Sequence, residues 1–483
     1  MFDLRPVGYV IGLLVAALGL TMLAPMVADI AAGNGHWPIF LECAFLTVLT
    51  GGLMALASQN GVTQGLSIRQ TFLVTTLVWF VLPVFGALPF ILGATNLSVT
   101  NAVFEAMSGL TTTGATVIGG IEALPEGLKL WRGILQWLGG IGIIVVAMVF
   151  LPELRVGGMQ IFRSEAFDTM GKILPRATEI SSRISVIYVS LTLLCALAYL
   201  ATGMDAFDAL IHAMTTVSTG GMANSDASFG AFGAGVQYVA SVFMVLAALP
   251  FVRYVQMISG GGLTPLWRDT QVHAFLGTIL VLVVIMSLWT ARTYHGFEEI
   301  AFRESLFNIT SIITGTGYSS ADYMQWGPFA VTLFFFIGLI GGCAGSTACS
   351  IKVFRYQLLF AAIRAQISRL HSPHGVFTPR YQGRAVSDDV LSSVMAFFGA
   401  FIVTLGIVSI ALGMTGLDFI TSVSGAAAAL ANIGPGLGSE IGPSGYYFGL
   451  NDTAKWILIF SMLVGRLEIL TVLTIVTWQF WRA

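Results

Sequence analysis

The stretch Thr111-Thr112-Thr113-Gly114-Ala115-Thr116 places hydroxyl groups and a glycine between two strongly apolar segments. Three other stretches stand in similar surroundings: Ser218-Thr219-Gly220-Gly221, Gly315-Thr316-Gly317-Tyr318 and Asn432-Ile433-Gly434-Pro435. Their central glycines follow one another at intervals of about a hundred residues, and weak self-similarity on this scale is typical of pore and transporter folds. The sequence therefore predicts one unit repeated four times, with its four loops around a common axis.

Neutral oxygens are the chemistry that the four stretches share. A monovalent cation that enters a low-dielectric region exchanges its hydration shell for fixed oxygens, and short extended segments supply these as backbone carbonyls. Glycine permits a positive φ, while Thr and Ser add hydroxyl oxygens without charge. The four stretches contain no Asp or Glu, whereas carboxylate ligands favour divalent ions. This pattern predicts a filter for a monovalent alkali cation.

The composition is that of a membrane protein with many spans. The 483 residues are 56% hydrophobic and 10% charged, and the mean hydropathy is +0.86, whereas soluble domains carry about 25% charged residues. The formal net charge of -2 gives no nucleic-acid signature. The apolar run after Arg5 is too long for a signal peptide and is expected to be retained. The cysteines lack metal-ligand spacing and are expected to be reduced packing residues: Cys43, Cys195, Cys343 and Cys349.

Ten apolar segments reach the roughly 20 residues that a membrane-crossing helix needs. Two of them, 8–28 and 37–57, precede the first loop and lie outside the fourfold plan. The other eight pair up around the four loops: 70–92 with 130–151, 184–203 with 235–252, 273–291 with 328–349, and 390–413 with 453–480. The expected fold is an all-α polytopic membrane protein, with four pseudo-symmetric span–pore helix–span units around a central pore and two N-terminal transmembrane helices in addition.

A short helix is expected before each loop. At roughly ten to twelve residues and 1.5 Å per residue it reaches only about halfway across the membrane, so it must be buried in protein or line water. Its negative C-terminal end would then face a held cation. External amphipathic connections are the alternative. The short helices would cover 101–110 and begin at Asp205, around Glu298 and at Asp418. The expected division is 1–65 for the extra helices, followed by units 66–155, 156–260, 261–388 and 389–483.

The basic residues favour cytoplasmic N- and C-termini. With ten spans, most Lys and Arg fall on the cytoplasmic side, in agreement with the positive-inside rule, and many lie in Arg155 to Arg183 and Lys352 to Arg384. The same topology places the four loops toward the outer side. The basic residues expected to face outward are Lys129, Arg132, Arg292, Arg303 and Lys455. Acidic residues near the mouth would either concentrate cations or keep the loops soluble: Glu122, Glu126, Asp226, Glu298, Glu299, Asp322 and Asp452.

A run of small residues, Gly341 to Ser350, lies in the second span of the third unit. Small residues commonly mark close helix packing. A run of poor helix formers below a filter also predicts a loop that opens and closes. The candidate gate residues in this run are Gly341, Gly342, Gly345, Ser346 and Thr347.

Arg466 is unusual because it lies within the last span. It stands about 16 Å along a helix from Lys455, so its side chain does not easily reach the outer surface. An intramembrane arginine is by default a functional-site hypothesis, since its burial is costly unless it faces water, a carbonyl or a carboxylate. Facing the pathway, it would repel cations until it is displaced or screened. The alternative is a buried partner, such as Glu468 of a neighbouring chain or a carbonyl at a helix break.

Five motifs carry a family resemblance: FEAMSG followed by TTTGAT, MDAFDA followed by STGG, TGTGY, NIGPGLG, and LQWLGGIGIIV in the span after the first loop. Together they resemble the Trk/Ktr/HKT superfamily of K+ transporters, most closely its bacterial Trk-type uptake subunits, the TrkH/TrkG type. The resemblance covers nearly the whole chain. It implies K+ uptake across the bacterial inner membrane, with K+ coordinated by carbonyls at Thr112, Thr113 and Gly114; Ser218, Thr219 and Gly220; Gly315, Thr316 and Gly317; and Asn432, Ile433 and Gly434.

The resemblance also implies a gate and partners. The run 341–350 would be an intramembrane gating loop with Arg466 beside it, and the protein would be a homodimer docked on a cytoplasmic ring of TrkA-like nucleotide-binding subunits. The basic segments Arg155 to Arg183 and Lys352 to Arg384 are candidate docking surfaces, although positive-inside topology alone explains such charge. The chain has no GxxxxGK[ST] phosphate loop, so nucleotide control is expected to come from a partner, and no cofactor is expected besides the transported K+.

One departure from a known signature bears on function. The loops differ from the TVGYG signature of K+ channels, and fewer ordered carbonyl rings predict weaker discrimination against Na+.

An H+- or Na+-coupled K+ symporter is the main alternative to this function. It would be expected to bury a titratable carboxylate on the pathway, for which Glu105 and Glu468 are the candidates. A membrane enzyme is the other alternative. It would need clustered His, Asp or Glu, but the histidines are dispersed and the pair His371/His374 is a weak metal signal.

Overall fold

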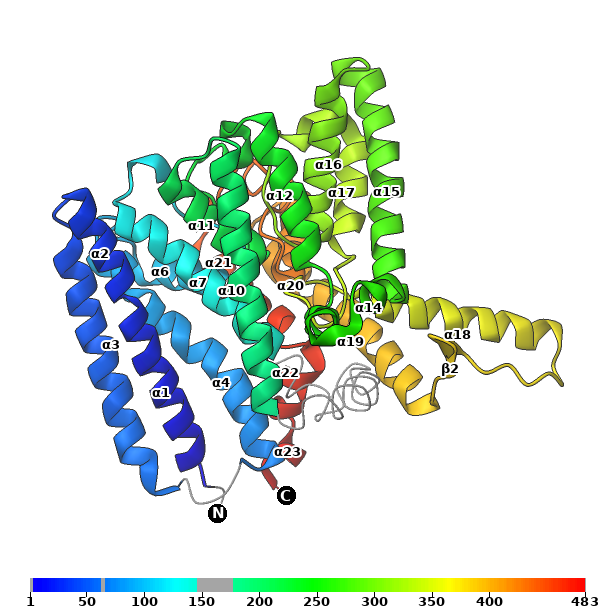
Figure 1. Cartoon of the computed structure of the whole chain (residues 1–483). Coiled ribbons are helices and arrows are strands. Elements are labelled where there is room, and N and C mark those ends of the chain that lie inside the picture. The colour runs from blue at the N-terminus through cyan, green and yellow to red at the C-terminus, as the bar shows by residue number, and fades with distance from the viewer. Residues whose placement is uncertain (1–2, 62–65, 146–176, 483) are drawn as a thin grey trace.

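The structure is a computed structural model that describes residues 3–61, 66–145 and 177–482. Long apolar helices form the bundle, short helices lie among them, and the described part contains one two-stranded hairpin (Figure 1). Among the described residues, seven helices are long and apolar enough to cross a membrane, and two bent helix pairs reach that length together. The expected all-α polytopic membrane fold is confirmed.

Helical spans precede the first loop, as expected. α1 (Arg5–Thr21) and α2 (Leu23–Ala32) form the first span, and α3 (Trp37–Ser58) packs beside it. Gly12 and Gly51 let the backbones of α1 and α3 approach closely, because a Cβ on either glycine would meet a backbone nitrogen of the other helix within 2.6 Å. Small residues at a helix interface commonly permit such packing in membranes.

The remaining helices repeat one order four times: a long helix, a short helix, a loop and a second long segment. The first set is α4 (Ile68–Gly86), α5 (Leu88–Leu92), α6 (Val99–Leu110) and α7 (Glu126–Val145). The second is α10 (Ala177–Ala201), α11 (Ala206–Val217), α12 (Ala234–Ala247) and α13 (Phe251–Gln256). The third is α15 (Thr270–Thr290), α16 (Glu299–Ile313), α17 (Gly327–Gly338) and α18 (Val353–His371). The fourth is α19 (Asp388–Gly413), α20 (Phe419–Ala431), α21 (Asp452–Arg466) and α22 (Ile469–Val476).

Smaller elements complete the fold. A single 3-10 turn follows each of the four loops: Ile121–Ala123, Ser228–Ala231, Tyr323–Trp326 and Tyr447–Gly449. Another, Gln59–Gly61, follows α3. The hairpin of β1 (Arg380–Tyr381) and β2 (Arg384–Ala385) follows α18, which extends away from the bundle (Figure 1). The short helices α14 (Thr264–Trp267) and α23 (Trp478–Arg482) follow α13 and α22. The domain division expected from the sequence stays a prediction.

The short helices begin where the sequence predicts and are buried toward their C-terminal ends. The side chains of Asp205 and Asp418 accept hydrogen bonds from the first backbone N–H groups of α11 and α20, as N-caps do. Glu298 precedes α16 without a side-chain cap bond. In α6, every residue from Asn101 to Leu110 is buried. These helices are therefore not external amphipathic connections.

Three expected second spans are not continuous helices, which corrects the sequence prediction. The chain bends by 86° between α12 and α13, where Pro250 cannot continue the hydrogen-bond ladder. It bends by 107° between α21 and α22, where Glu468 has a φ of 64°. In the third set, α17 ends at Gly338, and the small residues that follow are not helical. Hydropathy predicted these spans because it records length and polarity but not backbone breaks. The end of the expected span 130–151 lies outside the described residues.

Candidate functional site

Each short helix ends in the same backbone turn. A residue in left-handed conformation ends the helix, with φ between 51° and 74°: Thr112, Thr219, Gly315 and Asn432. The N–H of the next residue donates to the carbonyl five residues back, at 2.8 to 3.0 Å: Thr113 to Ser108, Gly220 to Thr215, Thr316 to Ser311 and Ile433 to Ala428. This pattern is the Schellman motif, which satisfies the last carbonyls of a helix and reverses the chain. The repeated turn sends all four loops away from their helices in one manner.

A second positive-φ residue, always glycine, follows in each loop and brings the loops together. The four glycines are Gly114, Gly221, Gly317 and Gly434. A Cβ on each would meet a carbonyl oxygen of the next loop: Gly114 meets Gly220 at 2.2 Å, Gly221 meets Thr316 at 1.9 Å, Gly317 meets Ile433 at 1.8 Å, and Gly434 meets Thr113 at 2.7 Å. Glycine is therefore required both by the backbone angle and by the space. The contacts run from the first loop to the fourth and back to the first, so the loops form a closed ring.

The structure shifts the second loop by one residue relative to the prediction. Gly221, not Gly220, has the positive φ and abuts the third loop. The segment that corresponds to Thr112–Gly114 is therefore Thr219–Gly221, and Ser218 is the C-cap residue of α11. Two consecutive glycines make the register ambiguous in the sequence, because either residue can adopt a positive φ.

Cavities lie on both sides of the ring. One is lined by all four positive-φ glycines together with residues of the outer loops, among them Thr116, Asp226 and Tyr446. The other is lined by the left-handed residue Asn432 and by residues of the small-residue run and the α21–α22 break, among them Cys349, Arg466 and Glu468. The ring therefore stands between two hollows, as a constriction in a pathway would.

The small-residue run forms a buried loop against the ring. Cys349 approaches two of the four loops: its Sγ lies 3.7 Å from Thr112 Oγ1, and its N lies 3.3 Å from the Cβ position of Gly315. Because the run is not helical, close helix packing is not its role. The candidate gate residues of the run all lie in this loop, and Gly345 and Thr347 contact the α12–α13 break.

Hydrogen bonds hold the candidate gate residues in place. Gly341 N–H donates to the Ile351 carbonyl at 2.9 Å, and Gly342 accepts from Val353 N–H at 3.2 Å, which closes the base of the loop. The other bonds lead to the α12–α13 break or stay within the loop: Gly345 accepts from Phe251 N–H at 2.9 Å, Thr347 Oγ1 donates to the Ala247 carbonyl at 3.0 Å, and Ser346 Oγ donates to the Cys343 carbonyl at 2.7 Å. The loop is therefore fixed at its base and at one helix break.

Arg466 is buried between this loop and α7 without a carboxylate partner in the described part of the chain. Its Nη1 donates to Cys349 Sγ at 2.6 Å, and its Nη2 donates to the Gly139 carbonyl at 3.2 Å. Its Nε has no hydrogen-bond partner among the described residues. Glu468 instead accepts a hydrogen bond from Arg355 of the same chain. The guanidinium charge is thus close to the ring and is held by a thiol and a carbonyl.

Lys352 and Arg355 increase the positive charge of this cavity. Lys352 Nζ donates to the Ala348 carbonyl, and the Arg355 guanidinium lies 3.8 Å from the centre of the Phe397 ring. With Arg466 they line the cavity together with one carboxylate, Glu468. Arg355 is buried and Lys352 is half-buried at this cavity. Neither is part of an exposed basic surface, which corrects the start of the predicted docking segment Lys352 to Arg384. Most of the other predicted segment, residues 155–176, lies outside the described residues.

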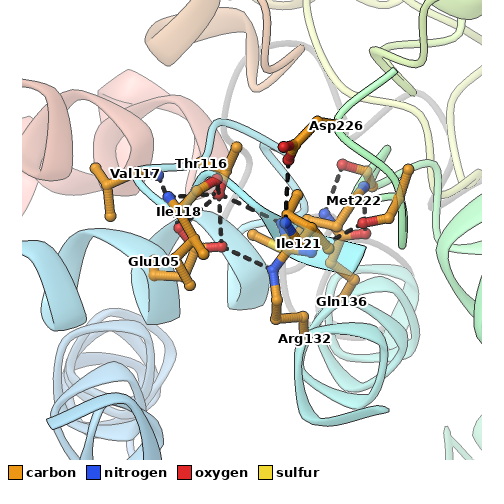
Figure 2. A network of polar contacts seen from close by, with 11 residues as sticks. Glu105, Thr116, Val117, Ile118, Ile121, Arg132, Gln136, Met222 and Asp226 are labelled. Carbon is orange, nitrogen blue, oxygen red and sulfur yellow. Dashed lines mark hydrogen bonds and ion pairs between the residues drawn. The ribbon is translucent and has the colours of Figure 1, made fainter. Parts of the chain in front are cut away.

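A buried ion pair supports the first loop from behind (Figure 2). Glu105 of α6 accepts from Arg132 Nε of α7 at 2.9 Å and from Val117 N–H at 2.9 Å, and Thr116 Oγ1 donates to its carboxylate at 3.0 Å. Arg132 Nη1 also donates to the Ala223 carbonyl of the second loop at 2.9 Å. Arg132, expected on the outer side, is 2% exposed and lines the cavity beside the outer loops. Lys455, also expected on the outer side, is buried with its Nζ on the Phe448 carbonyl. The side of the membrane that they face stays a prediction.

Gln136, one helical turn after Arg132, holds the second loop (Figure 2). Its Nε2 donates to the Gly220 carbonyl at 2.6 Å, and its Oε1 accepts from Met222 N–H at 3.1 Å. Sequence reasoning gave Gln136 no role. The motif LQWLGGIGIIV contained a signal for this role: Gln136 is its one strongly polar residue among apolar residues and glycines.

Two acids at the outer mouth bind the outer loops to each other. Asp226 accepts from Gly120 N–H at 2.8 Å and from Ile121 N–H at 3.2 Å. Glu122 accepts from Ser225 Oγ at 2.7 Å and from Asp226 N–H at 2.9 Å. The Ser225 hydroxyl bond holds the pKa of the Glu122 carboxyl below its usual value. These two carboxylates thus have a structural role in addition to their negative charge.

Residues 36–479 match the TrkH family, described as cation transport protein. The chain belongs to the TrkH family. Two curated proteins from Halomonas elongata are similar to it. Trk system potassium uptake protein TrkI is 46% identical over 416 residues, which cover 86% of this chain and 84% of that protein. Trk system potassium uptake protein TrkH is 39% identical over 486 residues, 99% of this chain and 100% of that protein.

A solved TrkH-family structure has the same fold. The crystal structure of the potassium transporter TrkH from Vibrio parahaemolyticus superposes with a TM-score of 0.91 at 35% sequence identity, covering 100% of both chains. The family resemblance inferred from the loop motifs is therefore confirmed. The family and these relatives are named as transport proteins and not as enzymes, and among the described residues no group of three or more His, Cys, Asp or Glu is placed to hold a metal ion.

Proposed function

We propose that this TrkH-family chain takes up K+ across the bacterial plasma membrane through the ring of four loops. Its curated relatives are named potassium uptake proteins, and the solved relative is a potassium transporter. The observation that carries the proposal is the closed ring, in which each loop is free of carboxylates and its glycine abuts a carbonyl of the next loop. Neutral oxygens fixed around one centre can replace the hydration shell of a large monovalent cation.

The proposed K+ ligands are backbone carbonyls of the four loops. They are those of Thr112, Thr113 and Gly114, of Gly315, Thr316 and Gly317, and of Asn432, Ile433 and Gly434, together with Thr219, Gly220 and Gly221 in the second loop. The dipoles of α6, α11, α16 and α20 favour a cation there, because each of these helices ends at the ring and carries a partial negative charge at its C-terminus. No additional cofactor is needed for this function.

The gate is proposed to be the buried loop 341–350 with Arg466. The loop lies against two of the four loops through Cys349, and Arg466 places a positive charge beside it. A cation that leaves the ring toward this side meets that charge in a medium of low dielectric, where repulsion is strong. Conduction would then require that the loop move away from the ring and that Arg466 be displaced or screened.

The partners and the membrane location are proposed from the family. The relatives are named as members of a Trk system, which supports the existence of partner subunits. The family resemblance adds a homodimer and a TrkA-like nucleotide-binding subunit on the cytoplasmic side of the inner membrane. α18 and its hairpin extend from the bundle (Figure 1), and their exposed basic residues are the proposed docking surface: Arg364, Arg369, Arg380 and Arg384. Both termini are proposed to be cytoplasmic.

Coupled symport is the second candidate, and the carboxylates argue against it. Glu105 pairs with Arg132, and Glu468 pairs with Arg355. Each candidate carboxylate is therefore committed to an arginine within the chain. A carrier that moves H+ or Na+ with K+ would need a carboxylate that alternates between partners during the cycle.

Flux measurements in proteoliposomes test the proposal. The purified chain is reconstituted, and K+ entry is followed along a K+ gradient while the Na+ and H+ gradients are collapsed, with protein-free liposomes as the control. We expect K+ entry above the control at a rate that does not change when either gradient is restored. Absence of K+ entry contradicts K+ uptake, and entry that depends on a Na+ or H+ gradient supports symport.

A further inference from the structure

The second loop differs from the other three at one position, and Gln136 lies there. The residue before the positive-φ glycine is β-branched in the first, third and fourth loops, where it is Thr113, Thr316 or Ile433, but it is Gly220 in the second. A β-branched residue restricts its own side chain and backbone, whereas two glycines in succession leave the chain with the widest choice of conformations. The second loop therefore needs a restriction from outside its own sequence.

Gln136 occupies the space that a side chain at position 220 would take. A Cβ on Gly220 would lie 2.4 Å from Cδ and Oε1 of Gln136 and 2.8 Å from its Nε2. Gln136 is fully buried in this position. A β-branched residue at 220 would therefore force the carboxamide of Gln136 out of this position. In the second loop, a side chain from α7 fills the space that the loop's own side chain fills in the other three.

The carboxamide of Gln136 fixes the peptide groups on both sides of Gly221 (Figure 2). Its donor is used by the Gly220 carbonyl and its acceptor by the Met222 N–H, so both of its polar atoms are bonded to one loop. The Gly220 carbonyl is also the group against which Gly114 of the first loop packs. The orientation of the Gly220 carbonyl therefore determines the backbone conformation of the second loop and also its contact with the first loop.

We propose that Gln136 is a specificity-determining positioning residue, which holds the Gly220 carbonyl in the orientation that lets the ring discriminate K+ from Na+. The proposal rests on the proposed K+ function of the ring. Oxygens that are fixed at one spacing fit one ion radius, whereas an oxygen that is free to move can follow a smaller ion. Gln136 acts through the Gly220 carbonyl and does not itself coordinate the ion.

Permeability ratios in proteoliposomes test this role. The variant Gln136→Met keeps the shape of the side chain but removes both hydrogen bonds. The matched control is Gln237→Met, since Gln237 is also a buried glutamine that donates to backbone carbonyls, at Phe229 and Phe232, and belongs to neither the ring nor its supports. With two hydrogen bonds lost, we expect the K+/Na+ permeability ratio to fall about tenfold in Gln136→Met, with K+ flux retained, and to stay unchanged in Gln237→Met.

A swap of side chains separates specificity from folding. Gly220→Thr combined with Gln136→Ala gives the second loop the β-branched residue of the other loops and frees the space for it. We expect this double variant to recover most of the ratio lost in Gln136→Ala, while Gly220→Thr alone does not. The proposal is overturned if Gln136→Met is monodisperse with an unchanged ratio, or if the double variant folds without any recovery. A wild-type protein that passes no K+ contradicts the proposed function itself.

Discussion

Arg466 donates a hydrogen bond to Cys349 across 2.6 Å, and this contact joins the α21–α22 break to the buried loop beside the ring. The same guanidinium reaches the Gly139 carbonyl of α7. The side chain of Arg466 thus connects α21 with α7 and with the buried loop 341–350. Movement of that loop away from the ring, with α7 and α21 in place, must break the Arg466–Cys349 contact.

Replacement of Arg466 by Ala should raise basal K+ flux. The change removes both the positive charge and the contact with Cys349, so the buried loop is less restrained and a cation meets less repulsion. The measurement is K+ entry into proteoliposomes without any cytoplasmic partner. Cys349→Ala keeps the charge and removes the contact, and we expect a smaller increase. Unchanged flux in both monodisperse variants would contradict a gating role for Arg466.

Replacement of Gly114 by Ser should reduce discrimination between K+ and Na+. The new Cβ would lie 2.2 Å from the Gly220 carbonyl oxygen, and the φ of 85° is unfavourable for serine. We expect the ratio of K+ to Na+ permeability to fall on the order of tenfold. Gly277→Ser is the matched control, because Gly277 lies on the exposed face of α15 with no atom within 4 Å of its Cβ position. Equal ratios in the two variants would argue that the first loop does not contact the ion.

Replacement of Glu468 by Gln should destabilise the protein. It removes the charge of Glu468 that pairs with the buried Arg355, and removal of one member of a buried ion pair costs about 3 kcal/mol or more. The expected result is a clear decrease in melting temperature in detergent. The pair of half-buried Arg303 and exposed Glu299 provides the control, since Glu299→Gln should lower the melting temperature only slightly. Similar melting temperatures for both variants would show that the buried pair contributes no more to stability than the control pair does.

Acidification should weaken the link between the first two outer loops. The Ser225 hydroxyl lowers the pKa of Glu122 from its ordinary value of 4.5. A carboxyl with a lowered pKa in the folded state contributes stability that is complete above the unfolded-state pKa and is lost as the pH falls through the folded-state value. The melting temperature of the wild type should therefore fall below pH 4.5. Glu122→Gln keeps an acceptor oxygen but does not titrate, so its decrease should be smaller; identical pH profiles would rule out this contribution.

Local signals made much of the ring predictable. Asp205 and Asp418 mark helix starts through bonds to the first N–H groups, and a glycine marks the point where each loop turns, so both features can be read from a few adjacent residues. The register of the second loop was not predictable, because the choice between Gly220 and Gly221 is made by Gln136 and by the carbonyl of Thr316. Both lie on other elements of the fold.

The supports of the ring and the helix breaks depend on tertiary contacts. Arg132 is buried because Glu105 lies opposite it on another helix, and positive-inside counting does not detect such pairing. The interruption at Glu468 lies within an apolar stretch long enough for a span, so hydropathy alone predicts a continuous helix there. Its φ of 64° goes together with the bond to Arg355, which is far away in the sequence.

The exchange at Gly220 shows what a ring made from a single polypeptide permits. In an assembly of identical chains, every substitution is repeated around the axis, so all quarters of the ring change at once. In this protein one quarter has a glycine supported by a glutamine from α7, whereas the other three have a β-branched residue at the same position. Selectivity can therefore evolve in small steps, one quadrant at a time.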